Sequence, residues 1–117
     1  MKKILILLIL FLGCKHCISQ LSYIDRIYQG VGGVDGIMRP NSIIVSPDDK
    51  NVYVIGNRRT ISIFKYNKLT KDLEYIESMI DGDKGVKGIF GIFQMDFSPD
   101  GKYLYGVLQD SNSIGGF

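Results

Sequence analysis

The sequence is poor in the side chains that metal binding and catalysis use most often. Its 117 residues hold two cysteines, Cys14 and Cys17, and one histidine, His16, all within the first 17 positions. A structural zinc ion takes four protein ligands, more than these residues supply. A c-type haem site requires histidine directly after the second cysteine, where Ile18 stands. We therefore predict no metal and no cofactor, and we interpret these residues as part of a discarded leader.

The leader is indicated by the charge and hydropathy of the first residues. Lys2 and Lys3 precede an unbroken apolar run over residues 4–12, which is the arrangement of a secretory signal. The run is too short to cross a bilayer of about 30 Å as a helix. Conventional cleavage after Ser19 would leave residues 20–117 as the mature chain.

A lipoprotein signal is the alternative for the same segment. Residues 11–14, Phe-Leu-Gly-Cys, are similar to a lipobox, which makes Cys14 a lipidation candidate, although Phe11 and Leu12 depart from the usual residues. The signal would then end before Cys14. Either route predicts an extracytoplasmic protein that is secreted, periplasmic or lipid-anchored at the cell surface, with membrane contact only through the signal or the lipid.

Few function classes survive these absences. Without its leader the chain has neither cysteine nor histidine, which excludes disulfides, histidine acid–base chemistry and cysteine nucleophiles. The net charge is +2, and basic and acidic residues are interspersed. Nucleic-acid binding requires a broader basic stripe, so we predict no nucleic-acid partner. The small basic spots at residues 57–59 and 65–68 are interpreted as solvated turns.

The chain repeats itself with an offset of 52 residues. Residues 21–53 align without a gap to residues 73–105, with thirteen identical pairs. The longest match joins Ser-Pro-Asp at 46–48 to Ser-Pro-Asp at 98–100. After Tyr53 the second copy needs one additional residue to keep the alignment. A period of this length predicts repeated supersecondary units that stack on one another.

One unit has the sequence pattern of four β-strands. Apolar or alternating runs at 42–45, 51–55, 60–66 and 73–80 are separated by turn residues, and Ser-Pro-Asp predicts a tight turn between the first two. Four antiparallel strands that become more polar outward are typical of a propeller blade. We therefore predict an all-β fold, an incomplete β-propeller of four-stranded antiparallel blades. Its parts over residues 20–117 are an outer strand at 21–29, a blade at 41–80 and a partial blade at 93–117.

Several of these motifs resemble a known family. The stretch 98–105, its relative at 46–53, the Ile-x-x-Phe strand followed by residues 70–73, and the glycine-rich segment 30–37 are similar to the lactonase-like seven-bladed propellers with YVTN-type repeats. The resemblance covers residues 21–117 and implies about two of seven blades. For some members it implies hydrolysis of sugar lactones or cyclisation of muconates by Glu, Arg and His at the channel mouth. No residue here matches that catalytic set, so no catalytic residue is carried over.

Candidate ligand-binding residues are those that differ between the copies in or beside the glycine-rich connection. Positions shared by both copies are interpreted as scaffold, whereas Arg39, Asp83 and Lys84 have no identical counterpart. We name these three as ligand-binding candidates. Asp35, Asp81 and Asp83 have some character of a calcium loop, but no further acidic residue completes it, so we interpret them as solvated turn acids.

The function predicted from the sequence is an exported binding or scaffold module that is inactive as an enzyme by itself. Its partner would be a small molecule, a glycan or a protein. One alternative is a lactonase-type hydrolase. Another is a short lectin-like protomer that completes a propeller as a homo-oligomer. Because two isolated blades leave two apolar faces uncovered, we expect the chain to be a fragment of a longer exported propeller. The alternatives are a short protomer that completes the propeller with further copies, and a chain that is folded in part and has no function alone.

Overall fold

The computed structural model describes residues 24–117. The predicted leader at 1–19, the lipidation candidate Cys14 and the first residues of the predicted outer strand lie outside the described residues. The fold is all-β, with two antiparallel sheets and one short 3-10 turn among the described residues. Within residues 24–117 we find no helix with the length and hydropathy needed to span a membrane.

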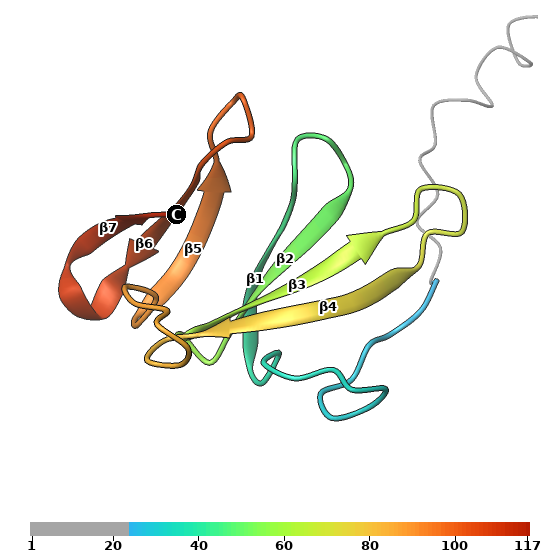
Figure 1. The fold of residues 1–117 in the computed structure, drawn as a ribbon, viewed down its shortest axis with the longest axis horizontal. Coiled ribbons are helices and arrows are strands. Elements are labelled where there is room, and N and C mark those ends of the chain that lie inside the picture. Colours follow the sequence, from blue (N-terminus) through green and yellow to red (C-terminus); the bar gives the residue numbers. More distant parts are fainter. Residues whose placement is uncertain (1–23) are drawn as a thin grey trace, which may run out of the picture.

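The first sheet, here called sheet A, is a four-stranded antiparallel meander (Figure 1). Its neighbouring strands follow one another directly in the sequence, so short turns connect them all. The strands are β1 (Pro40–Val45), β2 (Asn51–Gly56), β3 (Thr60–Tyr66) and β4 (Leu73–Ile80). Alternation of half-buried and exposed residues is clearest along β1 and β4, which form the two edges of sheet A.

The second sheet, sheet B, repeats the first three strands. Its strands are β5 (Ile92–Phe97), β6 (Leu104–Leu108) and β7 (Ser113–Gly116), and the turn η2 (Gln109–Ser111) lies between the last two. β5 begins and ends 52 residues after β1, and a bulge interrupts both strands at the matching place. The additional residue that the alignment requires falls in the loop from β6 to β7, next to η2. The sequence repeat therefore corresponds to a structural repeat.

The Ser-Pro-Asp turns have the same hydrogen bonds in both copies. Ser46 Oγ donates to Asp48 Oδ1 at 2.6 Å and accepts from the Asn51 amide at 3.0 Å. Ser98 makes the matching bonds with Asp100 and the Tyr103 amide, at 2.6 and 3.0 Å. Each aspartate also accepts the amide proton of the lysine two residues later. These shared residues thus close a hairpin, as the sequence predicted.

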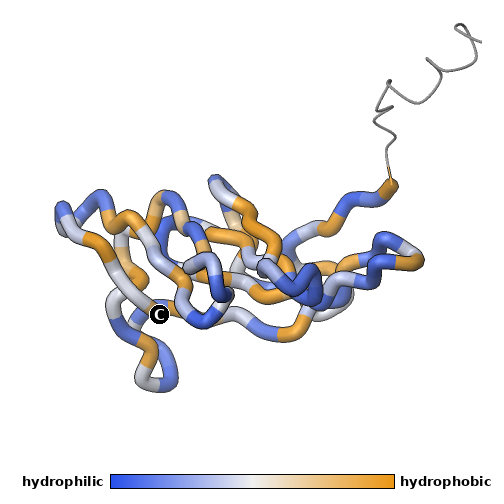
Figure 2. Tube along the Cα trace, turned by 90° about the horizontal axis from the view of Figure 1, so that it is seen from above, coloured by the Kyte–Doolittle hydropathy of each residue, from blue (hydrophilic) through white to orange (hydrophobic). Residues whose placement is uncertain are grey.

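The two sheets pack face to face and enclose the larger apolar cluster. β1 lies against β5, and Figure 1 shows that the two neighbouring sheets diverge from each other. Tyr53 of sheet A meets Phe97 of sheet B edge to face, with ring centroids 5.2 Å apart. The buried members of the cluster are Ile55, Ile61, Ile89, Ile92, Met95, Leu104 and Leu108. Figure 2 shows apolar and hydrophilic residues interspersed along the chain.

A smaller apolar cluster lies on the opposite face of sheet A. Val52 and Phe64 are buried there together with Val34, which comes from the segment before β1. Ile27 and Ile37 of the same segment pack against them. Sheet A therefore carries apolar side chains on both faces, one covered by sheet B and the other covered in part by residues 24–37. An incomplete, propeller-like stack of two sheets accounts for this arrangement.

The predicted outer strand at 21–29 differs from the structure over its described part. Residues 24–28 carry no strand assignment. A β-strand is defined by its ladder of backbone hydrogen bonds to a neighbour, and no strand among residues 24–117 pairs with this segment. The sequence pattern matched β4, but the matching third strand for it to join is not among the described residues.

Candidate functional site

Two connections lead into the sheets, and their backbones have the same hydrogen bonds. The first connection (residues 28–37) leads toward β1, and the second connection (residues 80–89) leads from β4 toward β5. The Gly30 amide donates to the Val34 carbonyl at 2.8 Å, and the Gly82 amide donates to Val86 at 2.9 Å. The sequence offset is thus maintained in the loop geometry.

Different side chains perform one structural role in the two connections. Gln29 Oε1 accepts the Ile37 amide proton at 2.8 Å, and Asp81 Oδ1 accepts the Ile89 amide proton at 2.9 Å. Asp81 is therefore a loop-closing residue. Its carbonyl also accepts from Arg59 Nη2 at 2.9 Å. Within the described range no three Asp, Glu, His or Cys residues gather closely enough to hold a metal ion.

Three hydroxyl side chains of sheet A fasten the first connection. The Oγ atoms of Ser62 and Ser78 lie 2.8 Å from each other, and both hydroxyl groups donate to the Asp35 carbonyl. Tyr75 donates to Ser78 Oγ at 3.0 Å. This network holds the end of the first connection against the middle of β3 and β4. The Asp35 side chain itself accepts hydrogen bonds within the first connection, from Gln29 Nε2 at 2.7 Å and from the Gly36 amide at 2.8 Å.

A hollow of about 410 Å³, lined by both polar and apolar side chains and here called the polar hollow for its charged residues, opens next to this network. Two of the three candidates from the sequence, Asp83 and Lys84, line it from the second connection. Asp35, Glu77 and Ser78 line it from the first connection and β4. The hollow therefore offers carboxylates, one ammonium group and hydroxyls from three segments. This combination suits a ligand with several hydroxyl or amide groups, which both donate and accept hydrogen bonds.

Arg39, the third candidate, is not among the residues that line the hollow. It occupies the left-handed region at φ 48°, and its counterpart Gly91 has φ 83°. At Gly91 a Cβ would lie 2.8 Å from Asp110 Cβ, so glycine is required there by the turn η2. The difference between Arg39 and Gly91 thus follows from packing in sheet B.

Sequence reasoning missed four residues with a structural or site role. Glu77 and Ser78 belong to the polar strand β4, where alternation alone gave no sign that they border a hollow. Arg58 lies 3.5 Å from Asp110 and 5.8 Å from the centre of the Phe93 ring, so it joins sheet A to sheet B. Arg59 and Arg58, interpreted as solvated turn residues, therefore also hold loops together.

The groups with shifted pKa values lie at the hairpin turns. The hydrogen bond from Ser46, followed by the Lys50 amide, lowers the pKa of Asp48 below 3.8. The hydrogen bond from Ser98, followed by the Lys102 amide, lowers the pKa of Asp100 in the same way. Asp49, whose carboxylate is 2.8 Å from Lys68 Nζ, raises the pKa of that lysine. These shifts have structural causes.

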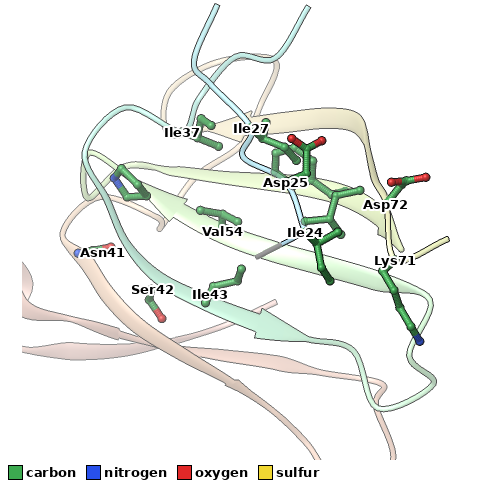
Figure 3. Close-up of a pocket in the computed structure, with 13 residues that line it drawn as sticks. Ile24, Asp25, Ile27, Ile37, Asn41, Ser42, Ile43, Val54, Lys71 and Asp72 are labelled. Carbon is green, nitrogen blue, oxygen red and sulfur yellow. The ribbon is translucent and has the colours of Figure 1, made fainter. Parts of the chain in front are cut away.

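A second hollow is an apolar groove of about 680 Å³ on the face of sheet A that is turned away from sheet B. Ile24 and Ile27 form one wall, and Ile43, Val54 and Phe64 of sheet A form the other. Figure 3 shows the labelled side chains of both walls, with Lys71 and Asp72 at the rim. The groove is part of a sheet face, and its lining is suited to apolar side chains.

No model of a known protein family matches the chain, and no curated protein matches it. Two solved structures are similar. One is a putative 6-phosphogluconolactonase from Bacteroides fragilis, at 25% identity and a TM-score of 0.56, over 67% of this chain and 20% of that one. The other is a functionally unknown protein from Desulfotomaculum acetoxidans, at 28% identity and a TM-score of 0.53, over 67% of this chain and 25% of that one. The chain thus spans a quarter or less of the length of either protein, and the likeness is to a lactonase-like fold.

Proposed function

We propose that this chain is an exported binding module and that the polar hollow beside β4 holds its ligand. The supporting observation is the contrast between backbone and side chains in the two connections. Their backbone hydrogen bonds match, yet Asp83 and Lys84 stand where the first connection has Val31 and Gly32. A charged pair replaces an apolar residue and glycine at the rim of a hollow, without any change of the loop that carries it.

The chemistry of the lining selects a neutral, hydroxyl-rich ligand such as a glycan. Carboxylates accept hydrogen bonds from sugar hydroxyls, and the lysine ammonium group donates to ring or hydroxyl oxygens. Asp83, Lys84 and Glu77 are exposed, so each contact competes with water and individual contributions are modest. Export is supported by the signal-like residues 1–19.

The test is a titration of the chain with a panel of neutral oligosaccharides, followed by NMR. We expect Asp83→Ala and Lys84→Ala each to weaken binding by about tenfold, which corresponds to about 1.4 kcal/mol. Val31→Ala, at the position that matches Asp83, serves as the control and should leave affinity unchanged. Equal affinity of all four proteins, or no binding to any neutral glycan, would contradict the proposal.

A lactonase-type hydrolase is the second candidate, favoured by the likeness to the putative 6-phosphogluconolactonase. Acid release from a sugar lactone, followed by pH-stat, separates the two functions. The binding proposal predicts a rate equal to that without protein. A rate that rises in proportion to protein concentration would establish the hydrolase instead.

A further inference from the structure

The outer face of sheet B has the same residue pattern as the inner face of sheet A. On sheet A, Ile55 and Ile61 are buried against sheet B with no exposed surface. Their counterparts on sheet B, Val107 and Ile114, are 50% and 77% exposed. Tyr105 likewise matches Tyr53 and is exposed on the same outer face. The inner face of sheet A packs on sheet B. The outer face of sheet B has the same residue pattern as that inner face, but it is exposed.

The outer face of sheet A has the pattern of the inner face of sheet B. Met95 is 5% exposed at the interface between the sheets, whereas its counterpart Ile43 is 65% exposed in the apolar groove. Phe97 packs against the enclosed cluster, whereas its counterpart Val45 is exposed. The outer face of sheet B thus resembles the inner face of sheet A, and the outer face of sheet A resembles the inner face of sheet B. The two inner faces pack together within one chain, so the two outer faces have the residue patterns needed to pack in the same way.

Residues 24–28 lie where an outer strand of a further sheet would lie. They enter the first connection as β4 enters the second, because both connections have matching hydrogen bonds. Ile27, the counterpart of Met79, packs on the smaller cluster of sheet A, and Met79 packs on the larger cluster. The apolar groove separates Ile24 and Ile27 from Ile43 and Val54. The space for the inner strands of a further sheet therefore lies beside this segment.

We propose that sheet B of a second copy of this chain binds the apolar groove, with residues 24–28 pairing to the free edge of its β7. β3 pairs with β4 so that Ile61 faces Met79 and Thr60 faces Ile80. Transferred by the repeat, Ile114 of one copy faces Ile27 of the next, and Ser113 faces Tyr28. Residues 24–28 become the fourth strand of the neighbouring sheet B, and Tyr105 packs on Val45 as its counterpart Tyr53 packs on Phe97.

A second copy is the occupant that the observations favour. One chain presents both halves of the contact, and the interface between sheets A and B shows that these two patterns pack together. Among residues 24–117, the outer edge of β7 and segment 24–28 have no strand partner. Each can offer alternating amide donors and carbonyl acceptors to one antiparallel ladder. The contact is head to tail, so it closes into a ring when the rotation allows. Propellers with four to eight blades correspond to two to four copies.

The test is disulfide formation between two variants of the full chain in which Cys14 and Cys17 are replaced by Ser. One variant carries Ile27→Cys and the other Ile114→Cys, and the two are unfolded together, refolded and oxidised. Residues directly opposite in an antiparallel pair have Cα atoms about 4.5–5.5 Å apart, which suits a disulfide. We expect a cross-linked dimer in the mixture and none from either variant alone.

A slipped pair is the matched control. Arg26→Cys with Ile114→Cys puts the two thiols on opposite faces of the new sheet and should give less than a tenth of the cross-linked product. Three results would overturn the proposal: no product from the mixture, product from one variant alone, or equal product from the slipped pair. Product from one variant alone would indicate a face that packs on itself. These results concern assembly and do not depend on glycan binding.

Discussion

At the scale of single residues, the Ser-Pro-Asp turn shows how one hydroxyl organises a hairpin. Ser46 is buried, and its Oγ links the Asp48 carboxylate to the Asn51 amide at the start of β2. The second copy repeats this with Ser98. Such residues could be assigned to a turn from sequence because the chemistry is local: the partners lie within five positions of one another.

Ser46→Ala should lower the free energy of unfolding by about 1 kcal/mol, the usual net value of one hydrogen bond. The Asn51 amide loses its partner, and the turn is less restrained. Ser42→Ala is the matched control, because no hydrogen bond of the Ser42 hydroxyl is found within the described residues. Urea unfolding followed by circular dichroism measures both. Equal unfolding midpoints for the two variants would show that the turn network does not contribute.

The lowered pKa values of Asp48 and Asp100 set the pH dependence of the turns. A carboxyl group whose pKa is lower in the folded chain stabilises it at pH values above the unfolded value of 3.8. This contribution disappears as the pH falls from that value through the lower folded one. The midpoint of urea unfolding should therefore decrease when the pH is lowered below about 4. The decrease should be smaller in the double variant Ser46→Ala with Ser98→Ala. An equal or larger fall in the double variant would contradict the assigned cause.

At the scale of elements, the sequence predicted strands and turns better than it predicted pairing. The four strands of sheet A lie where alternation and turn residues indicated, since those signals are local. The outer strand at 21–29 differed because pairing depends on a distant partner. The shared role of Gln29 and Asp81 was also hidden, because two different side chains accept the same amide hydrogen bond.

The candidate site was predictable in part, because differences between the two copies are visible in the sequence but the packing around them is not. Asp83 and Lys84 stood out as differences between copies, and they do line one hollow. Arg39 stood out equally, but its difference reflects the space that Asp110 takes at Gly91. A comparison of aligned copies finds positions that vary, and only the packing around each position tells whether a ligand or a neighbouring loop is the reason.

Gly36 and Gly88 form a matched pair that isolates the packing of the first connection. Both have positive φ, 91° and 83°. A Cβ at Gly36 would lie 2.5 Å from Ser78 Oγ and 2.7 Å from Ser62 Oγ, whereas a Cβ at Gly88 would meet nothing within 4 Å. Gly36→Ala should therefore cost about 1–3 kcal/mol more than Gly88→Ala, as overpacking does. Thermal unfolding of both variants measures this difference. Equal losses of stability would contradict tight packing of the first connection against Ser62 and Ser78.

At the scale of the whole molecule, two stacked sheets explain both the likeness to larger proteins and the exposed apolar surface. The chain spans 20% and 25% of the two similar structures, and each of its outer faces matches a face buried inside it. Fold and surface therefore lead to one expectation, that the stack continues across the apolar groove. The polar hollow lies apart from that groove, with no lining residue in common, so ligand binding and assembly can be tested separately.

Sedimentation equilibrium of the full chain and of its Ile114→Lys variant tests the continued stack most directly. Ile114 is 77% exposed in the single chain, so the substitution should leave the fold and its circular dichroism unchanged. We predict a mass of two to four chains for the unmodified protein, and the mass of one chain for the variant, because a buried lysine without a partner is costly. A single-chain mass for the unmodified protein, or the same multiple for both proteins, would contradict it.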